Sequence, residues 1–109
     1  MKAMPDALSL KTVPASNDPS STASARTIEH QAIVQQVYNA IYALTHQPAG
    51  QACPTIVGTV YGLSFVKDGV ELLSAIADKG GCRTVTSGDG YVRLADQAFW
   101  RLVHQAETA

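Results

Sequence analysis

Apolar residues recur at helical spacing from Thr27 to His46, a stretch that contains no proline or glycine. The repeating side chains lie on one face of a helix and are Ile33, Val37, Ile41 and Leu44. Thr27 is the expected N-cap of this helix. The sequence Gln-Pro-Ala-Gly over residues 47–50 ends it.

A second helical pattern runs from Ser64, its expected N-cap, to Lys79. The apolar stripe of this pattern consists of Val66, Leu72, Leu73, Ile76 and Ala77. Gly80 and the glycine after it end the helix. Gly69 inside the helix costs about 1 kcal/mol relative to alanine. It therefore marks a boundary or a close approach to another backbone.

The segment between these two patterns supports two interpretations. The β-branched Ile56 and Val60 favour a strand. Pro54 instead suits the first position of a two-turn helix, and Gly62 suits the position after its end. If residues 55–63 are extended, the chain forms a three-stranded sheet with helices on one face.

A β-hairpin is predicted over residues 82–94, where two β-prone runs flank Ser-Gly-Asp-Gly. Asp89-Gly90 is a strong hairpin signal because both residues tolerate positive φ. A short amphipathic helix follows, with Asp96 as its N-cap. Its apolar positions are Phe99, Leu102, Val103 and Ala106.

Residues 1–26 differ in composition from the rest of the chain and are predicted to be a disordered tail. They contain three prolines and a Ser/Thr/Ala-rich stretch with little apolar periodicity. Such a segment buries too little apolar surface to offset its ordering entropy. No continuous apolar core follows the basic start, so we expect no secretory signal and a cytoplasmic location. The folded domain is expected over residues 27–109.

Composition narrows the class of protein. The chain has 109 residues, of which 46% are hydrophobic, and a formal net charge of −1. This length allows one small domain and excludes a barrel enzyme or a two-domain dinucleotide enzyme. The apolar runs are too short to span a bilayer. The near-neutral charge does not favour nucleic-acid binding by bulk electrostatics.

The two cysteines, Cys53 and Cys82, are too sparse for a disulfide scaffold and lack the paired spacing of a zinc site. The sequence favours two reduced, buried thiols, and leaves a disulfide open. His30, His46 and His104 are scattered, and no catalytic motif accompanies them. We therefore predict no enzymatic activity, no metal, no cofactor and no membrane partner.

The order of the predicted elements resembles the winged helix-turn-helix family. The resemblance is carried by Tyr-Gly-Leu-Ser over residues 61–64, a helix ending at Lys79-Gly80, and a hairpin with a Gly/Asp tip. It covers about residues 27–106 and implies an α+β fold with a three-helix core, a β-hairpin wing and a C-terminal helix. It also implies that residues 54–61 are helical. Gly69 is a departure, since many members carry an apolar residue there.

The resemblance implies a transcriptional regulator that binds double-stranded DNA as a homodimer through its C-terminal helix. The helix Ser64–Lys79 would enter the major groove while the hairpin contacts the backbone. The predicted DNA-binding residues are Ser64, Lys67, Glu71, Ser74, Lys79, Arg83 and Arg93. Residues 79–101 carry four cations against two anions. DNA binding would thus depend on local clustering rather than on total charge.

A second hypothesis is a non-enzymatic protein–protein interaction module with a winged-helix-like or other α+β fold. Trp100 adjoins Phe99, and neighbouring helical residues point in different directions. One of the two aromatic rings therefore turns away from the apolar stripe. The predicted partner-binding residues are Tyr91, Trp100 and Arg101, because exposed aromatic residues anchor interfaces. Alternatively, Trp100 covers the first helix as part of a small core.

Overall fold

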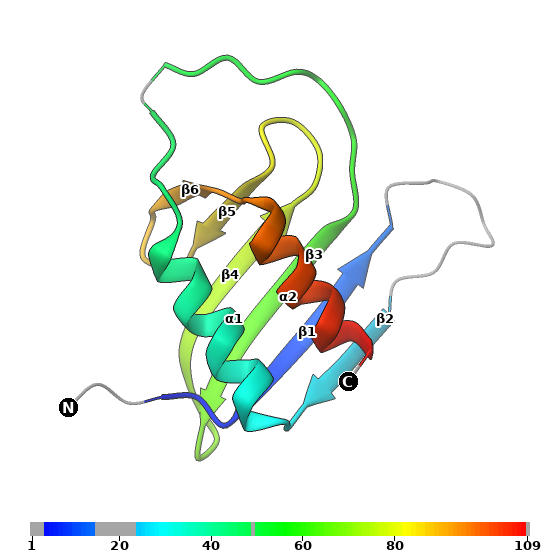
Figure 1. Ribbon diagram of the computed structural model, residues 1–109, viewed down its shortest axis with the longest axis vertical. Helices are drawn as coiled ribbons and strands as arrows, with labels where there is room; N and C mark the ends of the chain where they lie inside the picture. Colours follow the sequence, from blue (N-terminus) through cyan, green and yellow to red (C-terminus); the bar gives the residue numbers. More distant parts are fainter. Residues whose placement is uncertain (1–3, 15–23, 49, 109) are drawn as a thin grey trace.

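The computed structural model describes residues 4–14, 24–48 and 50–108. They form a six-stranded antiparallel sheet with two helices on one face (Figure 1). The strand order is β2-β1-β3-β4-β5-β6. The elements in chain order are β1 (Ala7–Val13), β2 (Ser24–Ile28), α1 (Gln31–Ala43), β3 (Val60–Lys67), β4 (Val70–Asp78), β5 (Thr84–Ser87), β6 (Val92–Leu94) and α2 (Gln97–Thr108).

The predicted winged helix-turn-helix fold, with its three-helix core, is wrong, although the broader α+β class is correct. The stretch Ser64–Lys79, expected as the recognition helix, forms the end of β3, a turn and β4. The described residues contain two helices and no three-helix core. Buried side chains in β3 and β4 alternate along the chain, which is the period of a strand with one buried face. They are Tyr61, Leu63, Phe65, Leu73, Ala75 and Ala77.

The turn between β3 and β4 explains the glycine that was expected to weaken a helix. Asp68 and Gly69 have φ values of 51° and 80°, and Lys67 pairs with Val70 across them. A two-residue loop with positive φ at both positions matches the twist of the flanking strands. Gly69 therefore supports the hairpin that replaces the expected helix.

The structure confirms the second predicted hairpin and the first and last predicted helices, but only one of the two expected N-caps. β5 and β6 form the predicted hairpin, and α2 follows it as predicted. The Oδ1 atom of Asp96 accepts a hydrogen bond from the backbone N–H of Phe99 at 2.8 Å, so the expected N-cap is confirmed. The first helix is also confirmed as α1, but Thr27 lies in β2 and His30 is the N-cap residue.

The prediction of a disordered tail over residues 1–26 is wrong for β1 and for the start of β2, which lie in that range. β1 lies between β2 and β3. Leu8 and Leu10 of β1 are fully buried under the helices. The short alternation of these two leucines with polar residues gave the tail a strand pattern. Residues 15–23 of the predicted tail lie outside the described residues.

The core fills the space between the helices and one face of the sheet. Tyr38 of α1 packs edge-on against Phe65 of β3, with ring centres 5.3 Å apart. Phe99 and Val103 bring α2 into the same core. No described element covers the opposite side of the sheet, which we call the outer face (Figure 1). Antiparallel sheets commonly leave one face to solvent in this way.

The connection from α1 to β3 has no regular helix or strand, so the expected helix over residues 54–61 is wrong. Two backbone hydrogen bonds of 3.0 Å hold this connection to the β4–β5 turn. The N–H of Gly81 donates to Ile56 O, and the N–H of Lys79 donates to Thr59 O. Gly58 and Gly80 cross so closely that neither has room for a Cβ atom.

Replacement of Gly80 is expected to separate the two crossing chains. A Cβ atom on Gly80 would lie 2.6 Å from the backbone nitrogen of Gly58. Because a backbone must move to relieve this overlap, Gly80→Ala should lower the free energy of unfolding by about 2 kcal/mol in chemical denaturation. Gly62→Ala is the matched control, since its Cβ meets only Lys11 Cβ at an ordinary 3.7 Å. Equal stability of the two variants would contradict the close crossing.

Candidate functional site

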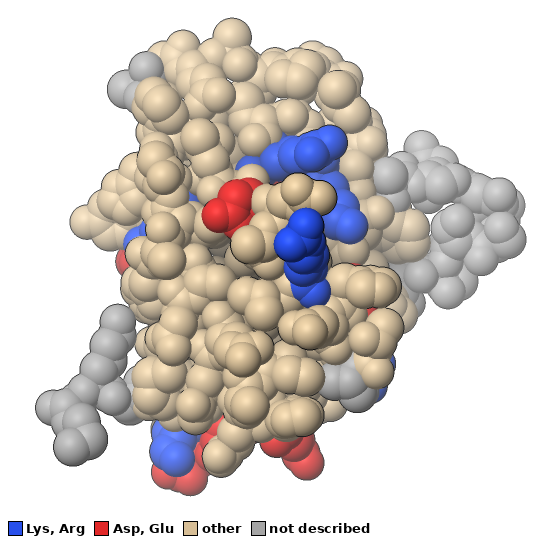
Figure 2. Space-filling model, viewed as in Figure 1, with Lys and Arg blue, Asp and Glu red and all other residues tan. Residues whose placement is uncertain are grey.

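Two of the four cations in the last third of the chain line a hollow with Trp100, and a third, Arg101, follows Trp100 on α2. Lys79, Arg83 and Trp100 line a hollow of about 240 Å³ beside α2. Trp100 and Arg101 line the adjoining surface of α2. Figure 2 shows blue basic side chains gathered over this part of the helix-bearing face, with a red acidic side chain beside them. We call Lys79, Arg83, Trp100 and Arg101 the basic surface.

Aromatic rings support the basic surface from below. The Nζ atom of Lys79 lies 5.4 Å from the ring centre of Tyr61 and 5.5 Å from that of Trp100. Phe99 contacts Trp100 edge-on, with ring centres 5.3 Å apart. Trp100 is thereby half-buried between the core and the surface. The ring faces hold the ammonium group by cation–π attraction and leave it accessible to an anion.

Tyr61 was expected to belong to a helical turn, and its part in the site was missed. In β3 its side chain is buried and reaches α2, where its hydroxyl hydrogen-bonds Glu107. Burial, together with this hydrogen bond and the negative charge of Glu107, raises the pKa of Tyr61 to about 12. The hydroxyl therefore stays protonated at neutral pH and ties α2 to the sheet beside the basic surface.

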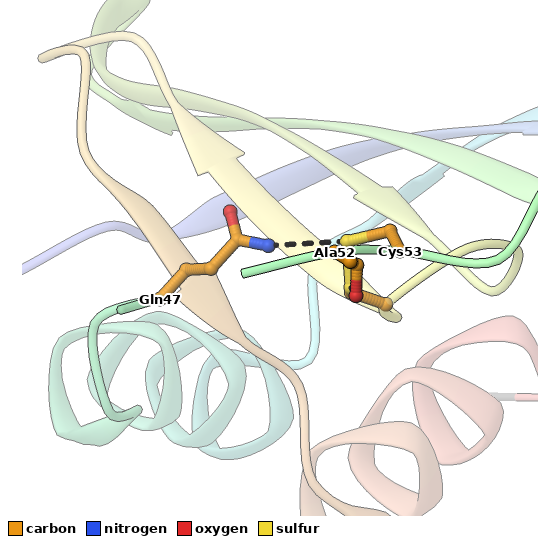
Figure 3. The surroundings of a disulfide bond; sticks show 4 residues. Gln47, Ala52 and Cys53 are labelled. Carbon is orange, nitrogen blue, oxygen red and sulfur yellow. Dashed lines mark hydrogen bonds between the residues drawn. A yellow bond between two sulfur atoms is a disulfide. The ribbon is translucent and has the colours of Figure 1, made fainter. Parts of the chain in front are cut away.

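A disulfide bond joins the α1–β3 connection to the β4–β5 turn (Figure 3). Cys53 and Cys82 are bonded, with Cα atoms 5.0 Å apart. The favoured interpretation of two reduced, buried thiols is therefore wrong; Cys53 is exposed and Cys82 is half-buried. Gln47 Nε2 donates a hydrogen bond to Cys53 Sγ at 3.4 Å. The bond anchors the backbone immediately before Arg83, whose φ of 57° lies in the left-handed region.

Arg93 does not belong to the basic surface. Its side chain is only 5% exposed, and Nη1 donates to Ser87 Oγ at 2.8 Å. The guanidinium carbon lies 5.5 Å and 5.4 Å from the ring centres of Tyr42 and Tyr91. Arg93 therefore holds the hairpin together from within. The expectation that both hairpin arginines reach phosphates fits only Arg83, which is exposed.

Ser87, which accepts the hydrogen bond from Arg93, also binds Asp89 at the tip of the hairpin. Ser87 Oγ donates to Asp89 Oδ1, and this hydrogen bond lowers the pKa of Asp89. The backbone N–H of Tyr91 and the charge of Arg93 lower it further, against a smaller rise from desolvation. The ionised carboxylate is thus stabilised in the folded hairpin.

The lowered pKa of Asp89 predicts a contribution to acid stability. A group whose pKa is lower in the folded state stabilises the protein above its unfolded pKa of about 3.9, and this contribution disappears as pH falls through the folded pKa. Asp89→Asn should therefore lose less stability than the unmodified chain between neutral and strongly acidic pH. Thermal unfolding followed at several pH values tests this, and parallel pH profiles would contradict it.

The other residues predicted to enter a DNA groove do not share a helix face. Ser64 and Ser74 lie on the outer face, and Ser64 Oγ donates to Glu71 Oε2 at 2.9 Å. Lys67 forms an ion pair with Asp6 at 3.8 Å. Tyr91 is exposed and stacks on His46, with ring centres 5.1 Å apart. Of the predicted DNA-binding residues, only Lys79 and Arg83 belong to the basic surface. Its other two members, Trp100 and Arg101, are predicted partner-binding residues.

In residues 4–14, 24–48 and 50–108, no cluster of three His, Cys, Asp or Glu side chains is placed to hold a metal ion. No helix in these ranges has the length and apolar character needed to cross a membrane. The chain matches no protein-family model, no curated protein and no solved structure.

Proposed function

We propose that this protein is a non-enzymatic interaction module whose basic surface binds an acidic segment of another protein. The observation that carries this proposal is the grouping of three cations, Lys79, Arg83 and Arg101, around the half-buried Trp100. Arginine and tryptophan contribute disproportionately to binding at protein interfaces. Guanidinium groups also match the geometry of carboxylates, which they bind through paired hydrogen bonds.

The rigidity of the surface supports the same proposal. Lys79 is held over two aromatic rings, and Arg83 follows a disulfide-linked cysteine. Arg101 lies on a capped helix whose residues Phe99 and Val103 are buried in the core. Backbone segments that are fixed in this way lose less conformational entropy on binding than a loose loop that carries the same side chains.

Duplex DNA is the less favoured anion. Its binding draws affinity from the neutralisation of many phosphates. The basic surface has three cations, with Asp96 at the start of the same helix, and the whole chain has a net charge of −1. The expected recognition helix is replaced by strands, so no helix is in place there for a major groove. A short run of carboxylates matches the number and spread of these cations better.

Binding can be followed through the fluorescence of Trp100, the only tryptophan. A synthetic peptide rich in Asp and Glu is expected to change this fluorescence at low salt, whereas the same peptide with Asn and Gln is not. Single alanine variants of Lys79, Arg83 and Arg101 should each weaken binding about tenfold, the loss of one charge-assisted hydrogen bond. Lys67→Ala, which removes a cation outside the basic surface, should bind as the unmodified chain does.

Two outcomes would overturn the proposal. The first is binding of duplex DNA, with a steep salt dependence, in the absence of binding to the acidic peptide. The second is binding of the acidic peptide that Lys67→Ala weakens as much as Arg83→Ala does. That result would show that the peptide binds by general charge attraction and not at the basic surface.

The compartment in which the module works is part of the same proposal. Disulfides persist in oxidising compartments and are rare in the cytoplasm. The Cys53–Cys82 bond therefore weighs against the cytoplasmic location predicted from the sequence, and we propose an oxidising environment. Acid quenching of cells followed by thiol alkylation and mass spectrometry tests this, because alkylation of both cysteines would indicate a reduced pair.

A further inference from the structure

The outer face of the sheet has small side chains at its centre. Together with Lys11, the residues Gly62, Ser64, Ser74 and Ile76 line a shallow trough of about 470 Å³ there. Ile76 is 56% exposed although it lies in the middle of β4, between β3 and β5. No described element covers this trough. A shallow trough with an exposed isoleucine at its side is a surface against which another sheet can pack.

Charges on the outer face are placed symmetrically about Ser64. In β1, Lys11 pairs with Gly62, two residues before Ser64. In β4, Glu71 pairs with Val66, two residues after Ser64. Because β1 and β4 flank β3 on opposite sides, the backbone positions of Lys11 and Glu71 lie at equal steps from Ser64 in opposite directions. Glu71 Oε2 accepts the hydrogen bond from Ser64 Oγ at 2.9 Å, and its second carboxylate oxygen remains for a cation.

This symmetry specifies the partner. We propose that a second copy of this chain packs against the outer face, so that Lys11 of each copy meets Glu71 of the other. A two-fold axis parallel to the sheets and passing over Ser64 exchanges the two charges. Such an interface uses the same surface on both subunits, as most homodimers do.

Steric fit supports the same arrangement. Neighbouring strands lie about 4.8 Å apart, and residues on one face of a strand repeat at about 6.7 Å. These two spacings fix the direction from Lys11 to Glu71. A two-fold axis perpendicular to that direction makes the strands of the two sheets cross steeply. Steep crossing is one of the two common modes of sheet packing. The axis brings Ser74 of one copy over Gly62 of the other, where no side chain stands in the way. It also brings the two Ile76 side chains together.

The remaining acidic group on this face does not disturb the charge match. Asp78 pairs with Val60 at the far end of β3, four residues from Ser64, and its Oδ1 accepts a hydrogen bond from the backbone N–H of Gly80 at 2.8 Å. It therefore lies away from the positions where Lys11 and Glu71 of the two copies meet. The dimer leaves the helix-bearing face of both copies exposed. The inference is therefore independent of the proposed function and adds a second basic surface to the same particle.

Charge reversal tests the dimer directly. Analytical ultracentrifugation of the full chain should show a dimer. Lys11→Glu and Glu71→Lys should each weaken it at least tenfold, since each places like charges opposite one another on both sides of the axis. The double variant should recover the dimer, because the charges are opposite again. Circular dichroism serves as the control that all variants are folded. A monomer at every concentration, or no recovery in the double variant, would overturn the proposal.

Cross-linking tests the geometry by a separate route. Cys53 and Cys82 are bonded to each other, so a cysteine introduced by Ile76→Cys is the reactive thiol. Under mild oxidation this variant should form a covalent dimer. Gln105→Cys, an exposed position on α2, should not. Cross-linking through Gln105→Cys alone would place the dimer contact on the C-terminal helix and contradict packing through the outer face.

Discussion

Removal of the Cys53–Cys82 disulfide is expected to lower the free energy of unfolding by about 3–4 kcal/mol. The two cysteines are 29 positions apart. Cross-linking over this separation removes conformational entropy from the unfolded chain, which accounts for an effect of that size. Apart from the two backbone hydrogen bonds to the β4–β5 turn, the folded connection has little side-chain support, because residues 51–57 are exposed. Few buried contacts are therefore available to compensate for the lost bond.

Urea denaturation of the Cys53→Ser/Cys82→Ser variant measures this effect. The unmodified chain in the presence of a reducing agent should unfold at the same urea concentration as the double variant. Reduction should also weaken binding of the acidic peptide, since the turn that carries Arg83 loses its anchor. A chain whose stability does not change on reduction would show that the bond contributes nothing to the fold.

Ser87→Ala is expected to destabilise the chain by about 2–3 kcal/mol, the range for the loss of a hydrogen bond to a buried charge. Ser87 Oγ is the acceptor for Arg93 Nη1 at 2.8 Å, and Arg93 is 5% exposed. The Nε atom of Arg93 already lacks a hydrogen-bond partner among the described residues. Without the hydroxyl, the buried cation retains the ring faces of Tyr42 and Tyr91 and the charge of Asp89, but it loses its hydrogen bond to Ser87.

Arg93→Met provides the matched comparison. It keeps an apolar stem between the two tyrosines and removes the charge and its donors together, so we expect a loss below about 1 kcal/mol. In the background of Arg93→Met, the Ser87→Ala substitution should cost less than in the unmodified chain, because Ser87 Oγ then loses its hydrogen bond to Asp89 Oδ1 but none from Arg93. A double-mutant cycle by chemical denaturation measures this coupling. Additive effects of the two substitutions would contradict the account of Arg93 as a charge that depends on Ser87.

The helices could be predicted from the sequence, but one long strand pair could not. In α1 the apolar repeat extends over several turns, and in α2 the N-cap Asp96 marks the start. Between Ser64 and Lys79, the apolar residues fit both the helical and the strand period, so this pattern alone does not separate a helix from a strand pair. Asp68-Gly69 carries the same dipeptide signal as Asp89-Gly90. Equal weight for both would have predicted the β3–β4 hairpin.

β1 was missed because its pattern is short. Only Leu8 and Leu10 are fully buried in it, and neighbouring prolines and serines dominate the local composition. Its place in the sheet depends on pairing with β3, more than 45 positions away in the chain. Local propensity contains no information on such a pairing.

The site was predictable in part. An excess of cations over residues 79–101 is visible in the sequence, and three of those four cations line the two hollows that share Trp100. The exclusion of Arg93 depends on which face of β6 is buried. The disulfide depends on the meeting of two segments without regular structure. The sequence feature that accompanies the disulfide is a glycine near each cysteine, Gly58 and Gly80. Glycines allow two backbone segments to approach closely, as these two do in the structure.

Nuclear magnetic resonance of the ¹⁵N-labelled chain during titration with the acidic peptide tests the central claim most directly. Trp100 provides a single indole N–H signal. The account predicts that this signal shifts together with the backbone amides of residues 79–83 and of Arg101, and that all of them saturate at one peptide concentration. Shifts confined to the outer face of the sheet, or no shift at low salt, would contradict binding at the basic surface.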